Sequence, residues 1–595
     1  MLARDSVREQ RHSAEALDAL LKGFEADAQG NQRLKGNAFE ALVKQYFLHD
    51  SQWRDQFSAV YLWAEWPGST GMDTGIDLVA IPHNDGNGPT APAPDAVAIQ
   101  CKFYAQGHRI QKGDIDSFLA ASGKHPFTRR IVVDTTNAEW GKNAAAAIED
   151  QQIPVTRVGL PDLRNSDIDW ATYSVDDDQG PLTRSRKSPR DHQVRAIQDV
   201  FQGFKESDRG TLVMACGTGK TFTALRIAQR CAEDNGGSAR ILFAVPSLAL
   251  MSQTLREWST ECELPFHAWS VCSDPKVSRS RAARSRAKQD LGDISVVDLK
   301  IPATTDAKKL AVSLARHCGS DGLQVVFTTY QSIQTIHDAQ VAGGETWRDF
   351  NMVICDEAHR TTGVALVDQD ESHFTKIHDD RFIRRARTLY MTATPRLFTP
   401  DTKKRARQRD VVLTSMDDSS VYGPVFHRLG FGDAVAQGLL TDYKVVVLGV
   451  PEDEVSEKYQ RMAESGGELN LETTAKLAGC WNALAKRQGP FADEEFSYGQ
   501  DSSPMRRAVA FCRDIKASKR IGGPEGTVSG EFEDLVATQL ADLSNEDDSD
   551  NLRVQCRHVD GTMNALVREE AMEWLKEGAG TSAALCAAFS QTRAV

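Results

Sequence analysis

The sequence has no long apolar segment. No run of about 18 uncharged apolar residues, the length that a membrane-spanning helix needs, occurs in its 595 residues. The first residues, MLARDSVREQRHSAEALDALL, carry charges throughout and have no apolar core of the kind found in signal peptides. We therefore expect a cytoplasmic protein without a membrane partner.

Cysteine pairs and positive charge are also scarce. The 11 cysteines include no CxxC pair and no cluster at zinc spacing, which predicts reduced thiols. The net charge of −13 argues against a protein that binds a polyanion over its whole surface. Any contact with nucleic acid therefore requires local basic grooves. The basic runs at 276–288 and 403–409 can contact phosphates or can simply be solvated faces.

Composition divides the chain into three domains and a linker. The boundaries that we expect are 1–165, a polar linker at 166–189, 190–425 and 426–595. In 190–425, short apolar runs alternate with amphipathic stretches, at 211–215, 241–245, 325–330, 352–357 and 388–393. This pattern predicts buried parallel strands joined by helices, a doubly wound α/β domain. The last domain repeats the pattern more sparsely, at 443–450, 507–512 and 554–561.

A glycine loop follows the first of these runs. The segment CGTGKT at 216–221 lies between a predicted strand and a predicted helix, where backbone N–H groups can face phosphate oxygens. Its candidate nucleotide-binding residues are Gly217, Thr218, Gly219, Lys220 and Thr221. Lys220 would reach the phosphates of ATP and Thr221 would bind Mg²⁺. The general pattern requires glycine where Met214 stands, so an ordinary glycine turn is the alternative.

Carboxylates and hydroxyls follow two further predicted strands. The run MVICDEAHR ends with Asp356, which can hold Mg²⁺, and Glu357, which can orient or deprotonate the attacking water. Thr392 and Thr394 lie at the end of the run TLYMTA and just after it. Upstream, the amide of Gln193 can recognise an adenine edge.

In this order the motifs resemble superfamily 2 helicases with a DEAH box. The resemblance also covers VPSLALMSQ (245–253), TTYQS (328–332) as a loop that contacts a DNA strand, and motif IV near 508–515. It implies two RecA-like lobes, at 190–425 and, in part, at 426–595, that clamp ATP and move along double-stranded DNA. His359 would couple the ATP site to movement, or it would make only a structural hydrogen bond.

The N-terminal domain has a separate set of polar residues. Glu40 lies on a predicted amphipathic helix, and Asp77 precedes an apolar strand. Gln100 and Lys102 are two apart on a second strand and so point to one face. An acid, a metal-binding oxygen and a lysine at strand ends can bind Mg²⁺ and activate water for phosphodiester cleavage. A chance grouping is the alternative, and Asp73 is a rival to Asp77.

These residues resemble the D…(E/Q)xK site of restriction-endonuclease-like folds, in the Mrr-type variant with glutamine. The resemblance makes Asp77 and Gln100 metal ligands, Lys102 a stabiliser of developing charge, and Glu40 a support for the metal. Such a nuclease at 1–165 ahead of a DEAH motor resembles the N-terminal part of type ISP restriction-modification enzymes, whose full-length members add methyltransferase and target-recognition domains. The type I restriction subunit is the alternative, although it usually has an acid at the position of Gln100.

The end of the chain departs from this resemblance. The family continues with motifs V and VI, whereas this chain ends in CAAFSQTRAV. One nucleotide sequence that can encode residues 587–595 gives RILSNARC when it is translated in another reading frame. RILSNARC resembles the sequence of the family at this point. We expect a frameshift after Cys586, with a divergent tail as the alternative. A second lobe truncated in this way would lack the motif VI arginine, so we expect weak ATP binding and hydrolysis of ATP near background. A second functional alternative is a non-catalytic remnant that binds DNA and ATP.

Overall fold

The computed structural model describes two compact units, 1–441 and 442–595. In the first unit the described residues are 2–54, 56–71, 74–82, 95–136, 138, 140–148, 151–174, 180–272, 303–317, 321–366, 375–398 and 411–441. In the second they are 442–443, 479–481, 483–486, 505, 507–512, 515–522, 555–559, 571 and 574–575. The two basic runs, Asp73 and the residues around Cys586 lie outside these ranges.

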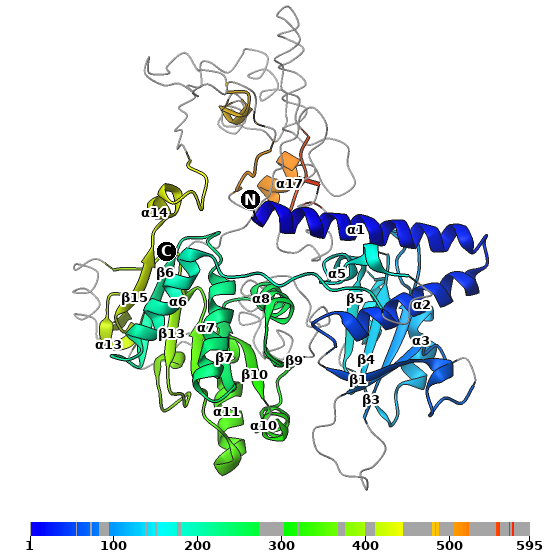
Figure 1. Cartoon of the computed structure of the whole chain (residues 1–595), viewed down its shortest axis with the longest axis horizontal. Helices are drawn as coiled ribbons and strands as arrows, with labels where there is room; N and C mark the ends of the chain where they lie inside the picture. The colour runs from blue at the N-terminus through cyan, green and yellow to red at the C-terminus, as the bar shows by residue number, and fades with distance from the viewer. Residues whose placement is uncertain are drawn as a thin grey trace, which may run out of the picture. The chain divides into compact units, whose positions relative to one another are not determined.

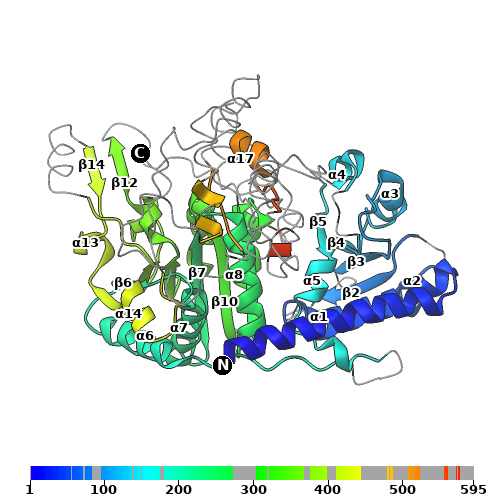
Figure 2. The ribbon, with the colours of Figure 1, turned by 90° about the horizontal axis from the view of Figure 1, so that it is seen from above.

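The N-terminal domain is a five-stranded mixed sheet between two helical layers (Figure 1). Its strands, in spatial order, are β1 (Phe57–Leu62), β2 (Leu78–Pro82), β3 (Ala96–Lys102), β4 (Phe127–Asp134) and β5 (Val155–Gly159). The first three pair antiparallel and the last three parallel. Figure 2 shows α1 (Leu2–Asp27) and α2 (Gln32–His49) on one side of the sheet, and α3 (Lys112–Ala121) and α4 (Lys142–Ile148) on the other.

Alternation along β3 explains why both faces of this sheet are covered. Val97 and Ile99 pack in the cluster under α1 and α2, whereas Ala96 and Ala98 pack in the cluster under α3 and α4. Both sets are buried, so the strand reads as one apolar run.

The start of the expected linker is folded onto the N-terminal domain. Trp170, in a short 3₁₀ turn after α5 (Leu160–Arg164), is buried with the α1 cluster. The Ser13 hydroxyl donates to the carbonyl of Ile168 at 2.8 Å and accepts from the backbone N–H of Trp170 at 3.0 Å. The structured part of this domain therefore extends beyond residue 165.

The central domain is an eight-stranded parallel sheet. In spatial order its strands are β15 (Val425–Leu429), β6 (Arg209–Met214), β13 (Thr388–Thr392), β11 (Met352–Cys355), β7 (Ser238–Val245), β10 (Gly322–Thr329), β8 (Phe266–Val271) and β9 (Ala303–Thr304). All five apolar runs predicted to be buried strands are strands here, and they pair in parallel. β15 crosses the expected boundary at 425/426 and pairs with β6 in this sheet.

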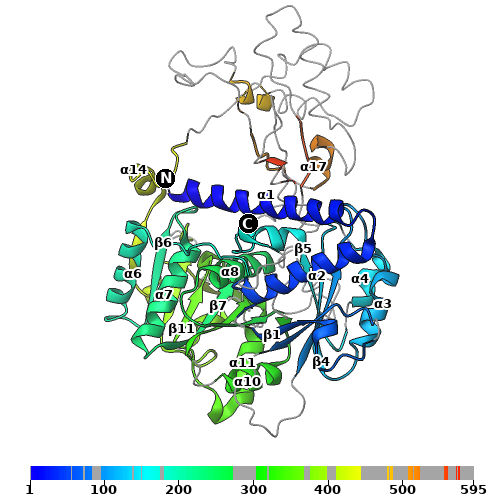
Figure 3. The same cartoon turned by 45° about the vertical axis from the view of Figure 1, so that its right-hand side comes forward.

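Helices cover both faces of the parallel sheet. One face packs against α6 (Asp191–Gly203), α7 (Lys220–Asp234) and α8 (Leu248–Glu261), and the other against α10 (Ala307–Arg316) and α11 (Ile333–Gly343). Figure 3 shows α6 and α7 side by side next to β6. The remaining elements are α13 (Ser419–Tyr422), α14 (Phe431–Ala436) and an antiparallel pair of β12 (Gly363–Leu366) and β14 (Val411–Thr414).

The second unit is described only in short pieces. They include α17 (Ile515–Gly522), whose Ser518 hydroxyl lies 2.7 Å from Nδ1 of His558. The runs expected at 443–450 and 554–561 and motif IV near 508–515 lie partly outside the described residues. Within the described part of the chain, we find no helix with the length and hydrophobicity of a membrane span.

A buried ion pair in the N-terminal domain gives the first prediction. Asp134 is fully buried at the end of β4 and accepts from Nε of Arg157 on β5 at 2.7 Å. Asp134→Ala would leave the guanidinium buried without its partner and should destabilise this domain by about 3–5 kcal/mol. Hydrogen exchange of the β4 amides measures the loss. Lys112→Ala, which breaks an exposed pair with Asp116, is the control and should change protection by less than about 1 kcal/mol; equal effects would contradict the prediction.

Candidate functional site

The N-terminal candidate residues meet where β2 begins and β3 ends. The backbone N–H of Cys101 donates to Oδ2 of Asp77 at 2.6 Å, so this carboxylate is tied to the strand that carries Gln100 and Lys102. The side-chain amide of Gln100 donates to the carbonyl of Gly75 at 3.1 Å. Asp77 is therefore held beside the end of β3 by the bond from Cys101 to its carboxylate and by the bond from its own N–H to the carbonyl of Ile99, at 2.9 Å.

Electrostatics place Glu40 in the same group. The Cys101 thiol has a pKa well above its usual value, first because it is buried and then because Asp77 and Glu40 lie near it, while Lys102 acts in the opposite direction. Because the charges of Asp77, Glu40 and Lys102 all act on this thiol, the three side chains lie near it. The aromatic contact of Phe39 with Phe103, with ring centroids 5.1 Å apart, holds α2 against the end of β3.

The donor set at this site fits a hard divalent cation. Oε1 of Gln100 is buried and has no hydrogen-bond partner among the described residues, and Gln100 as a whole is only 1% exposed. An amide oxygen beside two carboxylates is a typical Mg²⁺ ligand set. Among the described residues, no group of three or more His, Cys, Asp or Glu side chains is arranged to hold a metal.

The glycine loop between β6 and α7 has two glycines in the left-handed region and leads directly into the first turn of α7. Gly217 and Gly219 have φ of +81° and +83°, which only glycine adopts without strain, and Gly219 is the N-cap of α7. Lys220 is the first residue of that helix, where unpaired N–H groups attract anions. The hydroxyl of Thr218 donates to the carbonyl of Ala215 at 2.7 Å and closes the loop.

The side chain of Gln193 contacts the backbone of this loop. Its amide nitrogen is 3.4 Å from the carbonyl of Thr218 and 3.5 Å from that of Gly219, and its Oε1 accepts from the N–H of Arg190. The ring of His192 also contacts the Thr218 carbonyl, at 2.9 Å. In this structure Gln193 thus supports the loop backbone, and its role in reading adenine stays a prediction.

The paired acids lie at the end of β11, next to the glycine loop. Burial, followed by the charge of Glu357, raises the pKa of Asp356 to about 6, and Lys220 opposes this rise. A hydrogen bond with His359 lowers the pKa of Glu357, and Lys220 acts in the same direction. One lysine therefore acts on both carboxylates, which is the geometry expected of a site for Mg²⁺ and the terminal phosphates of ATP.

His359 joins the DEAH box to the end of β13. Its Nδ1 is 3.1 Å from Oγ1 of Thr392 and 3.3 Å from Oε2 of Glu357. Oγ1 of Thr392 also accepts from the backbone N–H of Thr394 at 3.2 Å. The predicted motif residues are thus linked by side chains across two neighbouring strands.

Sequence comparisons identify both domains. Residues 48–179 match a family model described as restriction endonuclease, and residues 186–397 match one described as type III restriction enzyme, res subunit. The chain is 22% identical over 347 residues, 57% of its length, to the type I restriction enzyme EcoAI endonuclease subunit of Escherichia coli, of which it covers 34%.

Two solved structures extend the likeness. Over 94% of its length the chain is 34% identical to the ATP-dependent type ISP restriction-modification enzyme LlaBIII bound to DNA, with a TM-score of 0.75. A nuclease-deletion mutant of the type ISP enzyme LlaGI, in complex with a DNA substrate mimic, is 30% identical over 67% of the chain, with a TM-score of 0.44. Over most of its length the chain is thus similar to a type ISP restriction-modification enzyme. It spans 34% of the LlaBIII chain and 25% of the LlaGI chain.

The expected fold class is therefore confirmed. The chain has a restriction endonuclease domain followed by a helicase domain with RecA-like lobes. Residues that the sequence interpretation did not single out also support the sites. Trp258 of α8 donates from its indole N–H to the carbonyl of Thr221 at 3.0 Å, and Tyr330 contacts Asp356. Tyr330 lay within the quoted TTYQS motif, whereas no sequence pattern marked Trp258.

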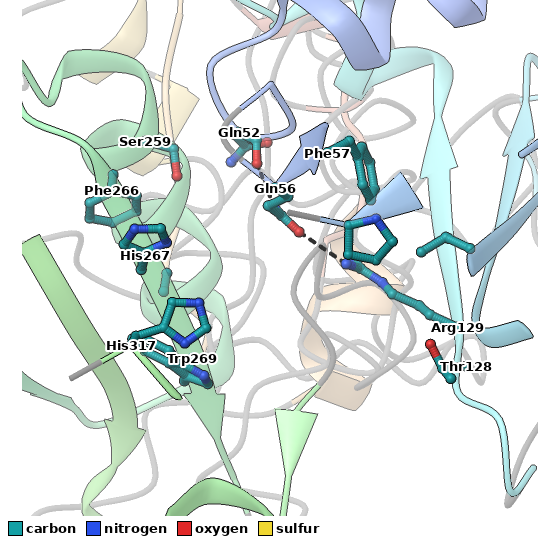
Figure 4. A pocket seen from close by; sticks show the side chains of 13 residues that line it. Gln52, Gln56, Phe57, Thr128, Arg129, Ser259, Phe266, His267, Trp269 and His317 are labelled. Atoms are coloured by element: carbon teal, nitrogen blue, oxygen red, sulfur yellow. Dashed lines mark hydrogen bonds between the residues drawn. The ribbon is translucent and has the colours of Figure 1, made fainter. Parts of the chain in front are cut away.

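A cleft of about 250 Å³ lies between residues of the nuclease domain and residues of the motor domain (Figure 4). Arg129 donates to Oε1 of Gln56 at 2.9 Å on one side, and His267 and His317 line the other. None of its lining residues is acidic. It marks where the nuclease meets the motor sheet.

Gly219 gives a prediction about the ATP site. An added Cβ would overlap the amide nitrogen of Gln193 and would also have to adopt φ of +83°. Gly219→Ala should therefore displace the loop and weaken binding of a fluorescent ATP analogue by about tenfold or more. Gly236→Ala is the matched control, because φ there is +76° but the space is open. If both variants bind ATP equally well, the loop is not the phosphate site.

Proposed function

We propose that this chain is an ATP-dependent DNA translocase joined to a Mg²⁺-dependent DNA endonuclease, and that it forms part of a restriction-modification defence enzyme. The observation that carries the proposal is the presence of two separate sites in one chain. Lys220, Asp356 and Glu357 meet in the motor, whereas Asp77 and Lys102 meet around Cys101 in the nuclease.

In the nuclease, Mg²⁺ would activate water and neutralise charge on the scissile phosphate. Asp77, the Oε1 atom of Gln100 and, as support, Glu40 would hold the ion. Lys102 would stabilise the charge that develops on the phosphate. The hydrogen bond from Cys101 to Asp77 keeps one carboxylate oxygen on the strand, so the carboxylate is already oriented before metal binds.

In the motor, Mg²⁺ would neutralise negative charge on the phosphates of ATP. Gly217, Gly219 and Lys220 would cradle the phosphates, and Thr221 and Asp356 would hold the ion. Glu357 would orient the attacking water. Its lowered pKa keeps it ionised at neutral pH, as this role requires.

Double-stranded DNA is the proposed partner. The likeness to one enzyme solved with DNA supports this. Methyltransferase and target-recognition domains, which we expect in full-length relatives, and a cytoplasmic location also stay proposals.

The nuclease assignment predicts loss of cleavage in two variants. The full chain should nick plasmid DNA with Mg²⁺ or Mn²⁺, and Asp77→Ala or Lys102→Ala should lower the rate by roughly 100-fold or more, because each removes a group that acts on the reacting phosphate. Lys112→Ala, an exposed lysine of the same domain, is the control. Lys220→Ala should still nick, since the nuclease site lies within its own domain. Undiminished cleavage by the Asp77 and Lys102 variants would refute the site.

The motor assignment predicts Mg-ATP binding that depends on Lys220. In fluorescence titrations with an ATP analogue, Lys220→Ala should weaken binding by roughly tenfold or more, because it removes the charge that meets the phosphates. Lys205→Ala removes an exposed lysine just after α6, bonded to Gln202, and should leave binding unchanged. Equal affinity of the Lys220 variant and the unaltered chain would contradict the assignment.

A further inference from the structure

The side-chain amide of Gln100 has a defined orientation in the nuclease domain. Its nitrogen donates to the backbone carbonyl of Gly75 at 3.1 Å. A carbonyl oxygen can only accept, so the amide nitrogen must be the atom that faces it, and Oε1 is turned the other way. This oxygen is buried and has no hydrogen-bond partner among the described residues, which is unfavourable for an amide oxygen. A cation bound at Oε1 would supply the missing partner.

The carbonyl of Gly75 is itself fixed by the surrounding backbone. Gly75 has φ of +75°, a left-handed conformation that favours glycine. A Cβ at this position would lie 2.6 Å from Oγ of Ser117 and 3.2 Å from the backbone nitrogen of Phe118, so Gly75 packs directly against α3. Any larger residue would have to displace this turn from α3 and move the carbonyl away from Gln100.

Asp77 holds the same turn against β3 on both sides of Gln100. Its backbone N–H donates to the carbonyl of Ile99 at 2.9 Å, and its carboxylate accepts from the N–H of Cys101 at 2.6 Å. The bond from the Gln100 amide back to Gly75 completes the set. Three hydrogen bonds thus fix this turn relative to the end of β3, and they fix the direction of the amide with it.

A glutamate could not replace Gln100 in this arrangement. Its side chain has the same length, but both terminal atoms of the ionised carboxylate are oxygens that only accept hydrogen bonds. One of them would face the carbonyl of Gly75, and two acceptors that carry negative charge repel each other. The carboxylate would have to move to avoid this contact, and its second oxygen would then leave the position of Oε1.

We propose that Gly75 is a positioning residue whose carbonyl orients the Gln100 amide toward the divalent cation, so that this metal site requires glutamine rather than glutamate. The proposal rests on the proposed function, because it takes Asp77 and Gln100 as ligands of that cation. Negative charge added at position 100 should therefore weaken metal binding, although charge alone would strengthen it.

The first test changes the charge of the ligand and leaves the backbone in place. The full chain carries Asp356→Asn, which removes the acid proposed to hold metal in the motor, and electron paramagnetic resonance measures how much added Mn²⁺ stays unbound. In this parent chain Gln100→Glu should weaken binding of Mn²⁺ by about tenfold or more, the usual effect of a metal ligand that loses its orientation. Binding as tight as in the parent, or tighter, would overturn the proposal.

The second test asks whether Gly75 acts through Gln100. Gly75→Ala should weaken Mn²⁺ binding by about 10- to 100-fold in the parent chain. In a parent that also carries Gln100→Ala, which has no amide to orient, Gly75→Ala should change the affinity by less than about twofold. Equal losses in both parents would show that Gly75 serves only the fold of the domain and would overturn the proposal.

Gly30→Ala is the matched control for the backbone change. Its φ is +86°, but no atom lies within 4 Å of an added Cβ, so this variant should leave Mn²⁺ binding unchanged. Should Gly75→Ala unfold the domain, the result for Gln100→Glu decides, since that change leaves the backbone as it is. Asp77→Ala separates the proposal from the proposed function. If Asp77→Ala leaves Mn²⁺ binding of the parent unchanged, the nuclease metal site itself is refuted, whereas if it abolishes binding and Gln100→Glu does not weaken it, only the role of Gly75 is refuted.

Discussion

The parallel pairing of β6, β13 and β11 is the constraint on which the ATP site depends. Thr392 pairs with Val213 and Cys355 with Tyr390, so the three strands end at one edge of the sheet. The glycine loop, the DEAH box and the threonines of motif III follow these strands, and their side chains therefore meet although Gly217 and Thr394 lie 177 residues apart. In open α/β sheets this edge is where ligands bind.

The nuclease site is built by a different constraint. There β2 and β3 are antiparallel, so the start of one strand lies beside the end of the other. Asp77, which precedes β2, thereby reaches the backbone of Cys101 near the end of β3. Because Gln100 and Lys102 flank that backbone group, a single hydrogen bond sets the position of the carboxylate relative to both. A register shift by one residue would turn Gln100 and Lys102 to the other face.

The sequence predicted the central strands because both of their faces are buried, which gives continuous apolar runs. It did not predict β8 or β15, at or near the edges of the sheet, where part of each strand is exposed and the run is broken. The glycine loop, the DEAH box and the nuclease residues were identified because each chemistry needs particular residue types close together in the chain. Trp258 and Tyr330 could not be assigned in this way, since their partners are 37 and 26 residues away and are backbone carbonyls.

The same limit applies to the segment predicted as a polar linker. Its composition favours a loose tether, but long-range bonds fix both of its ends. Near the motor, the carbonyl of Lys187 accepts from Arg226 of α7, and its ammonium pairs with Glu261 of α8 at 2.9 Å. The α8 residue Arg256 also pairs with Asp162 of the nuclease domain at 3.1 Å. Because Trp258 of the same helix holds the carbonyl of Thr221, α8 contacts both the nuclease domain and the first turn of α7. Hydrogen-bonded and ion-paired side chains therefore connect the nuclease domain with the helix that follows the glycine loop, and a flexible tether would not provide such a connection.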